Sequence, residues 1–398
     1  MHGPYVVVIH RQGYESRHES TYDWFQDYVS FYQIISSASG MTAIRKVAIF
    51  GTSNLSLGGV WAPKDGLRVG RVLGIHASSP THRLFPHLYA YPPDVKIGCR
   101  RELRRAHHVA LTSAGFGVTV LTRPGSASAF PTDLPVIRVD YSDVDALATA
   151  LAGQDAVVCA VGPGAIGAAK GMVDAAARAG VKRYIINDFG WGLNKRSLPE
   201  FKPIGEPRKV AWDCAIDYAQ RDEGKENGFT WTGITIGNPI DWALAKFPRM
   251  GFNIAERRAT IYDAGTEEFT GTTLEGIGQS VVGVLQHPSE TANRFVKVRS
   301  IQISQNSLLA AFQKATGKGE KQWKIEHSTA RQALEEGRGK HAQGLGGWVL
   351  DLLVFQLYAP GEARCIVASR EGSDSPLLGV REESADEVVE KALSRARS

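Results

Sequence analysis

The sequence predicts an α/β fold, with a doubly wound parallel sheet followed by a smaller mixed α/β domain. Between residues 117 and 237, short apolar runs typical of strands alternate with longer runs typical of helices, at the spacing of β–α–β units. The apolar run 47–50 ends in Gly51, as a strand does when it leads into a glycine turn. Together these observations predict a Rossmann-like sheet covered by helices on both faces.

The elements of this sheet follow in order along the chain. Predicted strands are 46–50, 117–123, 134–143, 155–162, 182–190 and 229–237. Predicted helices are 143–152, 165–181, closed by Gly180, and 207–221, with Pro207 near its first turn. We therefore assign residues 41–240 to a dinucleotide-binding domain.

After Pro239 the alternation changes, which predicts a smaller domain over 241–398 that shapes a substrate pocket. Predicted strands are 258–265 and 293–304, and predicted helices are 272–286, 305–316, 329–337, 345–358 and 384–396.

Two segments fit neither domain. Residues 1–40 read as an extension outside the domain, and residues 55–106 as an irregular insert in the first β–α unit. Both are biased toward His, Arg and Pro, and we expect both to be mostly disordered. One hypothesis is an upstream extension and a translated intron, which sequencing of the transcript would test. The other is a genuine insertion, in which Cys99–Ala114 forms the first helix after Gly98, with Arg100, Arg101, Arg104 and Arg105 near the phosphates.

The composition excludes several classes of protein. At 43% hydrophobic and 22% charged residues it is typical of a globular chain. No apolar run approaches the roughly 20 residues of a membrane span, and the first residues lack a signal-peptide pattern, so we expect a cytoplasmic location. The four cysteines have no metal-binding spacing, and the basic excess near 51–107 carries no nucleic-acid motif. We expect neither a metal nor a nucleic-acid partner.

The candidate cofactor site begins at the glycine turn. Gly51 occupies the position of the first turn glycine, and Thr52, Ser53 and Asn54 can offer backbone N–H groups to phosphate. The usual glycine spacing is missing, so an ordinary strand–turn glycine is the alternative. Arg123 closes the next strand, where an arginine suits the 2′-phosphate of NADP, and Ser126 can add a hydroxyl. A solvated arginine is the alternative there.

Further candidates follow the later strands. The stretches 161–164 and 187–192 come at strand carboxyl ends, where open α/β sheets bind ligands. Lys209 follows on the next helix and can serve as a general acid or base, although a surface lysine is the alternative. The Tyr-x-x-x-Lys pair of ordinary short-chain dehydrogenases is missing. The residues Trp191, Trp231 and Trp242 are more typical of packing than of a stacking platform.

Several stretches together resemble the NmrA-like and isoflavone reductase-like family, in its fungal branch. They include MTAIRKVAIFGTSN, GFGVTVLTRPGS, VKRYIINDFGWG, GNPIDWAL and TTLEGIGQSVVGVLQHP, and the resemblance covers about 41–54 and 107–395. It implies an atypical short-chain dehydrogenase/reductase fold that binds NADP(H). It also implies a cofactor-binding set of Gly51, Thr52, Ser53, Asn54, Arg123, Ser126, Asp140, Val161, Gly162, Asn187, Asp188, Phe189 and Asn238, with Lys209 as the active-site lysine.

The leading functional prediction is an NADPH-dependent reductase of a small, aromatic or conjugated metabolite. The first alternative is an NADP-binding, redox-sensing regulator that turns over nothing and binds a protein partner. The second is a folded chain that binds no cofactor because the glycine turn is interrupted. The substrate and the oligomeric state stay open.

Overall fold

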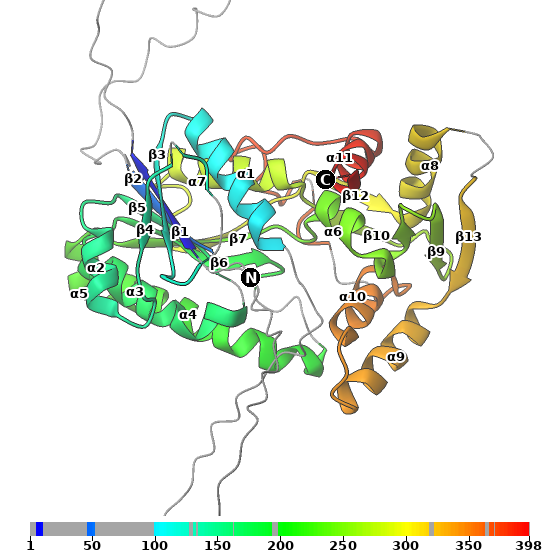
Figure 1. The fold of residues 1–398 in the computed structure, drawn as a ribbon, viewed down its shortest axis with the longest axis horizontal. Coiled ribbons are helices and arrows are strands. Elements are labelled where there is room, and N and C mark those ends of the chain that lie inside the picture. Colours follow the sequence, from blue (N-terminus) through cyan, green and yellow to red (C-terminus); the bar gives the residue numbers. More distant parts are fainter. Residues whose placement is uncertain are drawn as a thin grey trace, which may run out of the picture.

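The computed structural model describes residues 5–10, 46–51, 99–126, 130–132, 134–161, 163–192, 198–317, 322–362, 366–369 and 371–397. Within this part of the chain, the main sheet has eight strands (Figure 1). From one edge to the other they are β11 (Arg294–Lys297), β7 (Thr230–Thr235), β6 (Arg183–Gly190), β5 (Ala156–Ala160), β2 (Lys46–Gly51), β1 (Tyr5–His10), β3 (Gly117–Thr122) and β4 (Val136–Arg138). The predicted doubly wound α/β fold is confirmed.

One strand differs from the expected all-parallel order. Strand β1 lies between β2 and β3 and pairs antiparallel with both of them. Its six residues belong to the segment 1–40 that the sequence assigned to an extension outside the domain, and they lie within the sheet instead. The run Val6–Ile9 is β-branched, which favours a strand. Local sequence does not specify which strands it joins, because that depends on contacts distant in the chain.

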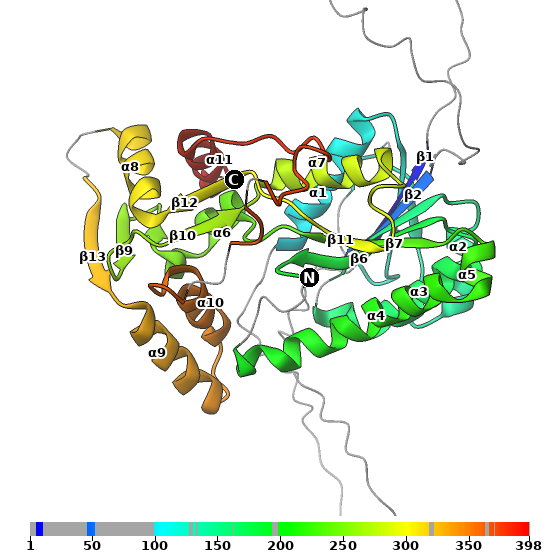
Figure 2. The same cartoon turned by 180° about the vertical axis from the view of Figure 1, so that it is seen from behind.

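Helices cover both faces of the sheet (Figures 1 and 2). One face packs against α1 (Cys99–Ser113) and α7 (Leu274–Gln286), and the other against α2 (Val144–Leu151), α3 (Ala169–Arg178) and α4 (Lys202–Gln220). Alternation along β5 explains the two cores, since Val158 faces the first and Val157 the second, both fully buried.

Helix α1 matches the expectation that Cys99–Ala114 forms the first helix. It packs on α7, where a Cβ at Gly278 would lie only 2.7 Å from the carbonyl oxygen of Ala106. A glycine at this position therefore lets the two helix backbones approach closely. The side chains of Arg100, Arg101, Arg104 and Arg105 lie outside the described residues, as do Gly98 and 55–98.

Two helices differ from the sequence prediction in their first turns. Helix α4 begins at Lys202 rather than near Pro207, so Pro203 occupies its first turn and Pro207 lies inside the helix. Pro207 has no backbone N–H, so one hydrogen bond is missing near the start of α4, and the helix is held by its remaining backbone bonds. The predicted helix 165–181 begins as the 3₁₀ helix η1 (Pro163–Ala168) before α3, and Gly180 closes it with a φ of 77°.

The short elements η2 (Pro199–Phe201) and α5 (Asp222–Glu226) directly precede and follow α4. The smaller part of the molecule contains α6 (Ile240–Lys246), η3 (Pro248–Met250), β8 (Phe252–Asn253), β9 (Arg258–Tyr262), β10 (Glu268–Gly271), β12 (Ile301–Ser304), α8 (Gln305–Thr316), β13 (Lys324–Ser328), α9 (Ala330–Ala342), α10 (Trp348–Tyr358) and α11 (Ala385–Arg397). Strand β10 pairs with β12, and β9 pairs with β8 and β13.

The predicted domain boundary at residue 240 does not separate the two parts of the fold. Helix α7 and strand β11 follow residue 240 in the chain, yet α7 packs on the main sheet and β11 is one of its strands, paired parallel with β7. The segment 293–304, expected as one strand, divides into β11 and β12. The amide of Val298 donates to Thr235 of the main sheet and that of Ser300 to Gly271 of β10, so the backbone passes from one sheet to the other.

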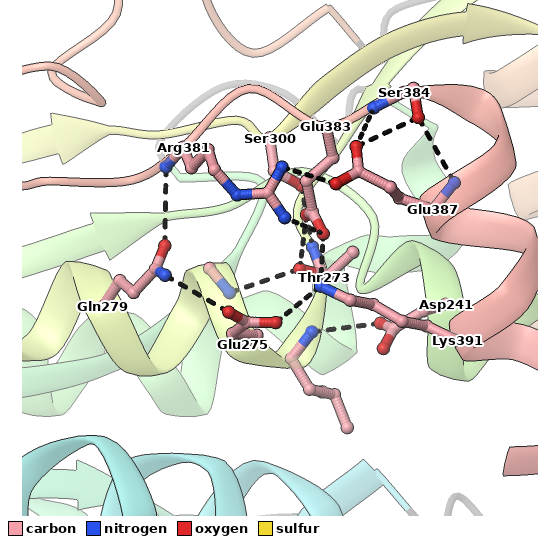
Figure 3. A network of polar contacts seen from close by, with 12 residues as sticks. Asp241, Thr273, Glu275, Gln279, Ser300, Arg381, Glu383, Ser384, Glu387 and Lys391 are labelled. Carbon is pink, nitrogen blue, oxygen red and sulfur yellow. Dashed lines mark hydrogen bonds and ion pairs between the residues drawn. The ribbon is translucent and has the colours of Figure 1, made fainter. Parts of the chain in front are cut away.

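Polar contacts bind the C-terminal segment to the start of α7 (Figure 3). The buried carboxylate of Glu383 accepts a hydrogen bond from Thr273 Oγ1 at 2.6 Å and pairs with Lys391. Lys391 also reaches Glu275 at 2.6 Å. Asp241, fully buried, accepts from the amide of Leu274 and from Arg395 Nε. Glu275 in the first turn of α7 complements the helix dipole, and the ion pairs join α11 to α6 and to the start of α7. No helix in the described residues is long and apolar enough to span a membrane.

Candidate functional site

The candidate site lies at one edge of the main sheet. Strands β2, β5, β6 and β7 run parallel, so their carboxyl ends meet at the same edge. Among the predicted phosphate-turn residues, the structure describes only the backbone of Gly51, in register with Ala160. Thr52, Ser53, Asn54 and Gly162 lie outside the described residues. The described part of the candidate site therefore consists of the residues that follow β3, β5, β6 and β7.

Arg123 follows β3 in a tight turn, in which the amide of Ser126 donates to the carbonyl of Arg123 at 3.1 Å. Arg123 is half-buried, and its buried Nε has no hydrogen-bond partner among the described residues. Partial burial lowers the pKa of the guanidinium, while Tyr141 and Asp140 act in the opposite direction. An arginine that keeps its charge while a donor is unpaired fits an anionic ligand such as a 2′-phosphate.

Asp140 lies at the end of the neighbouring strand, and its carboxylate is held in place by Ser142. Both the amide and the hydroxyl of Ser142 donate to Asp140 Oδ1, at 2.9 and 2.8 Å. These bonds lower the pKa of Asp140, with a smaller contribution from Arg123. Asp140 is exposed and its ionised form faces the charge of Arg123, so the two side chains lie at the same corner of the site.

Strand β6 ends in the predicted residues Asn187, Asp188 and Phe189. Asp188 is buried, and its carboxylate accepts from Thr235 Oγ1 at 2.8 Å and from the amide of Gly192 at 3.3 Å. It therefore ties the end of β6 to β7. Phe189 has a φ of 38°, which lies in a backbone region that residues other than glycine seldom adopt. The side chain of Asn187 is outside the described residues, and Val161 after β5 is buried.

A residue that the sequence did not single out lies against this strand end. His107 of α1 is fully buried, and its ring centroid is 4.8 Å from that of Phe189. Neither ring nitrogen has a hydrogen-bond partner within the described part of the chain, and burial lowers the pKa of His107 to about 3. The imidazole is therefore neutral at physiological pH. Only its position in the fold identifies it, because a histidine on a predicted helix is ordinarily a surface residue.

Asn238 joins the end of β7 to the smaller part of the molecule. Its carbonyl accepts from the amide of Thr272 at 2.9 Å, and it forms a parallel bridge with Gly271 of β10. The predicted packing role of Trp191, Trp231 and Trp242 is confirmed, since all three are buried. Asn238 thus lies at the junction between the strand ends of the main sheet and the smaller domain.

Lys209 lies on the exposed face of α4, where its Nζ pairs with Asp213 Oδ2 at 2.5 Å. This contact raises the pKa of Lys209, so the amine stays protonated at neutral pH. Among the residues that the structure describes, Lys209 forms no hydrogen bond or ion pair with the strand-end residues. Its neighbour Arg208 is half-buried, and its buried Nε has no hydrogen-bond partner in the same part of the chain. In the described part of the chain, His, Cys, Asp and Glu side chains form no cluster suited to a metal.

The fold and the strand-end residues define a nicotinamide dinucleotide-binding protein of the Rossmann class. The profile of a protein family described as NAD(P)H-binding matches residues 104–262. Oxidoreductase poxI of Penicillium oxalicum is 58% identical over 285 residues, which cover 71% of this chain and 88% of that protein. Oxidoreductase aprR of Aspergillus flavus is 32% identical over 221 residues, covering 54% of this chain and 70% of that protein.

Solved structures give the same fold. Isoflavone reductase has a TM-score of 0.55 and 17% identity, over 72% of this chain and 94% of that one. AtPrR2 with NADP+ and (+)-pinoresinol has a TM-score of 0.53 and 20% identity over the same shares. The chain belongs to the NmrA-like and isoflavone reductase-like family of NAD(P)H-binding oxidoreductases. The prediction that the cofactor is NADP(H) agrees with membership of this family.

Proposed function

We propose that the protein is an NADPH-dependent reductase of a small aromatic or conjugated molecule. The observation that carries the proposal is Arg123, a half-buried guanidinium after β3 whose Nε has no hydrogen-bond partner in the part of the chain that the structure describes. An arginine there favours the 2′-phosphate of NADPH over the free ribose hydroxyl of NADH. The substrate class is supported by neighbours in the same fold, isoflavone reductase and a protein crystallised with pinoresinol.

The cofactor supplies the hydride, and the residues of this chain hold its two ends. Arg123 and Ser126 bind the 2′-phosphate. Val161 and the turn 187–189 line the nicotinamide side, where Asp188 fixes the loop to β7. The substrate lies between this edge and the smaller domain, beside Asn238. Lys209 has a raised pKa, so any part that it takes in a proton transfer is that of a donor.

Cofactor selection is tested by titrating the full chain with NADPH and with NADH, followed by nicotinamide fluorescence. We expect wild-type protein to bind NADPH much more tightly than NADH. Arg123→Ala should weaken NADPH binding about 10- to 100-fold and leave NADH binding unchanged, since a charge-assisted contact is worth about 1.5–3 kcal/mol. Equal affinities for the two dinucleotides in the wild type would refute selection by Arg123.

The role of Lys209 is tested separately, by turnover of an isoflavone or a quinone panel with NADPH. Lys209→Ala should lower kcat about 100-fold or more without changing the Kd for NADPH, because a general acid acts on the chemical step. Asp213→Ala is the matched control, since it removes the partner of Lys209 and keeps the amine. Full activity of Lys209→Ala would exclude this lysine from the reaction.

A further inference from the structure

Arg138 reaches from the end of β4 over the turn that carries Arg123 and Ser126. In the sheet, Arg138 is in register with Thr122, the last residue of β3. Its Nη1 donates to the carbonyl of Ser126 at 3.1 Å and to that of Pro124 at 3.4 Å. One guanidinium nitrogen therefore bonds two carbonyls of a four-residue turn on the neighbouring strand.

The middle of the turn has little other support among the described residues. Pro124 and Gly125 are both exposed, and a Cβ at Gly125 would meet no atom of the described residues within 4 Å. Within the turn, the bond from the amide of Ser126 to the carbonyl of Arg123 closes the backbone. The bonds from Arg138 add a contact with the next strand, which restricts how far the turn can move relative to the sheet.

The same bonds change the electrostatics of the corner. Peptide carbonyls carry negative partial charge and repel a phosphate. Arg138 donates hydrogen bonds to two of these carbonyls, so their repulsion of an anion bound by Arg123 is reduced.

We propose that Arg138 is a positioning residue for the 2′-phosphate of NADPH, acting through the turn 123–126. It holds Arg123 and Ser126 where they contact the phosphate, and it is a second determinant of the preference for NADPH over NADH. This inference rests on the proposed cofactor selection by Arg123.

The test measures the Kd for NADPH and for NADH in the full-length protein and in Arg138→Ala, Arg138→Lys, Arg123→Ala and the double variant Arg123→Ala/Arg138→Ala. Arg138→Ala should weaken NADPH binding about tenfold and change NADH binding less than about twofold. Arg138→Lys should recover most of the loss, because one ammonium can donate to both carbonyls. Arg178→Ala, which removes an exposed arginine paired with Asp145, is the matched control and should change neither Kd.

The double variant distinguishes positioning from an independent charge effect. If Arg138 acts through the turn, Arg138→Ala should change the Kd for NADPH less than about twofold once Arg123 is already alanine. A further tenfold loss in the double variant would overturn the positioning role, as would an equal loss for NADPH and NADH in Arg138→Ala. An unchanged Kd for both would overturn it too. If wild type does not prefer NADPH, the selection by Arg123 fails first, and this inference fails with it.

Discussion

The two polar regions of the molecule satisfy their charges differently. In the C-terminal network the buried carboxylates of Asp241 and Glu383 each have cationic and hydrogen-bonding partners. Near the strand ends and on α4, Arg123, Arg208 and His107 have buried nitrogens without a hydrogen-bond partner among the described residues. An unpaired buried polar group costs roughly 1–3 kcal/mol, so these side chains do not add to stability as the paired carboxylates of the network do. The difference agrees with a structural role for the network and with the ligand-binding role proposed for the strand ends.

The largest expected effect is in the C-terminal network. Asp241→Ala should lower the free energy of unfolding by about 3 kcal/mol, because it leaves Arg395 and the amide of Leu274 without their buried acceptor. Chemical denaturation monitored by circular dichroism measures it. Asp241→Asn keeps an acceptor for Leu274 and should cost less. A loss below about 1 kcal/mol for Asp241→Ala would contradict a stabilising role of this network.

At the strand ends, Thr235→Val tests the buried carboxylate of Asp188, which accepts hydrogen bonds from Thr235 and Gly192. The change removes the hydroxyl that donates to Asp188 and should cost about 1.5–3 kcal/mol of unfolding free energy, as expected for a bond to a charged group. It should also weaken NADPH binding, because the turn 187–192 loses a tie to β7. Thr235→Ser keeps the donor and serves as control. Stability equal to wild type in Thr235→Val would argue that Gly192 suffices to hold Asp188.

His107 makes the stability of the fold depend on pH. Its pKa is lowered to about 3 in the folded chain, so below the ordinary value near 6.5 only the unfolded chain takes up the proton. Protonation of this group in the unfolded chain should lower the free energy of unfolding by about 2 kcal/mol as the pH falls from 7.5 to 5. His107→Leu should remove this difference when unfolding curves are compared at the two values. An identical pH dependence in wild type and variant would contradict the burial of a neutral imidazole.

The smallest effect is expected at an exposed ion pair. Glu362→Ala removes the partner of Arg331, both of which are half exposed, and should change the unfolding free energy by less than about 1 kcal/mol. The same denaturation curves measure it. A loss as large as that of Asp241→Ala would mean that burial does not separate the two kinds of charge pair in this protein.

Local patterns in the sequence were sufficient for most elements of the main sheet. Apolar runs of strand length and amphipathic runs closed by glycine located β3, β5, β6, β7, α2 and α3, because these signals depend on neighbours in the chain. The same patterns could not divide 293–304 into two strands. That break is set by hydrogen bonds from Val298 and Ser300 to partners about 30 or more residues away.

The candidate site shows the same limit. The fold class, a glycine at the end of β2 and an arginine after β3 could be predicted from the sequence, because each depends on residue type at a fixed place in a β–α unit. Only the tertiary structure decided that Asp188 is buried and bound to Thr235, that Lys209 pairs with Asp213 at the surface, and that His107 and Arg138 lie at the strand ends. Burial and partner are properties of the packed chain, and residue type alone does not fix them.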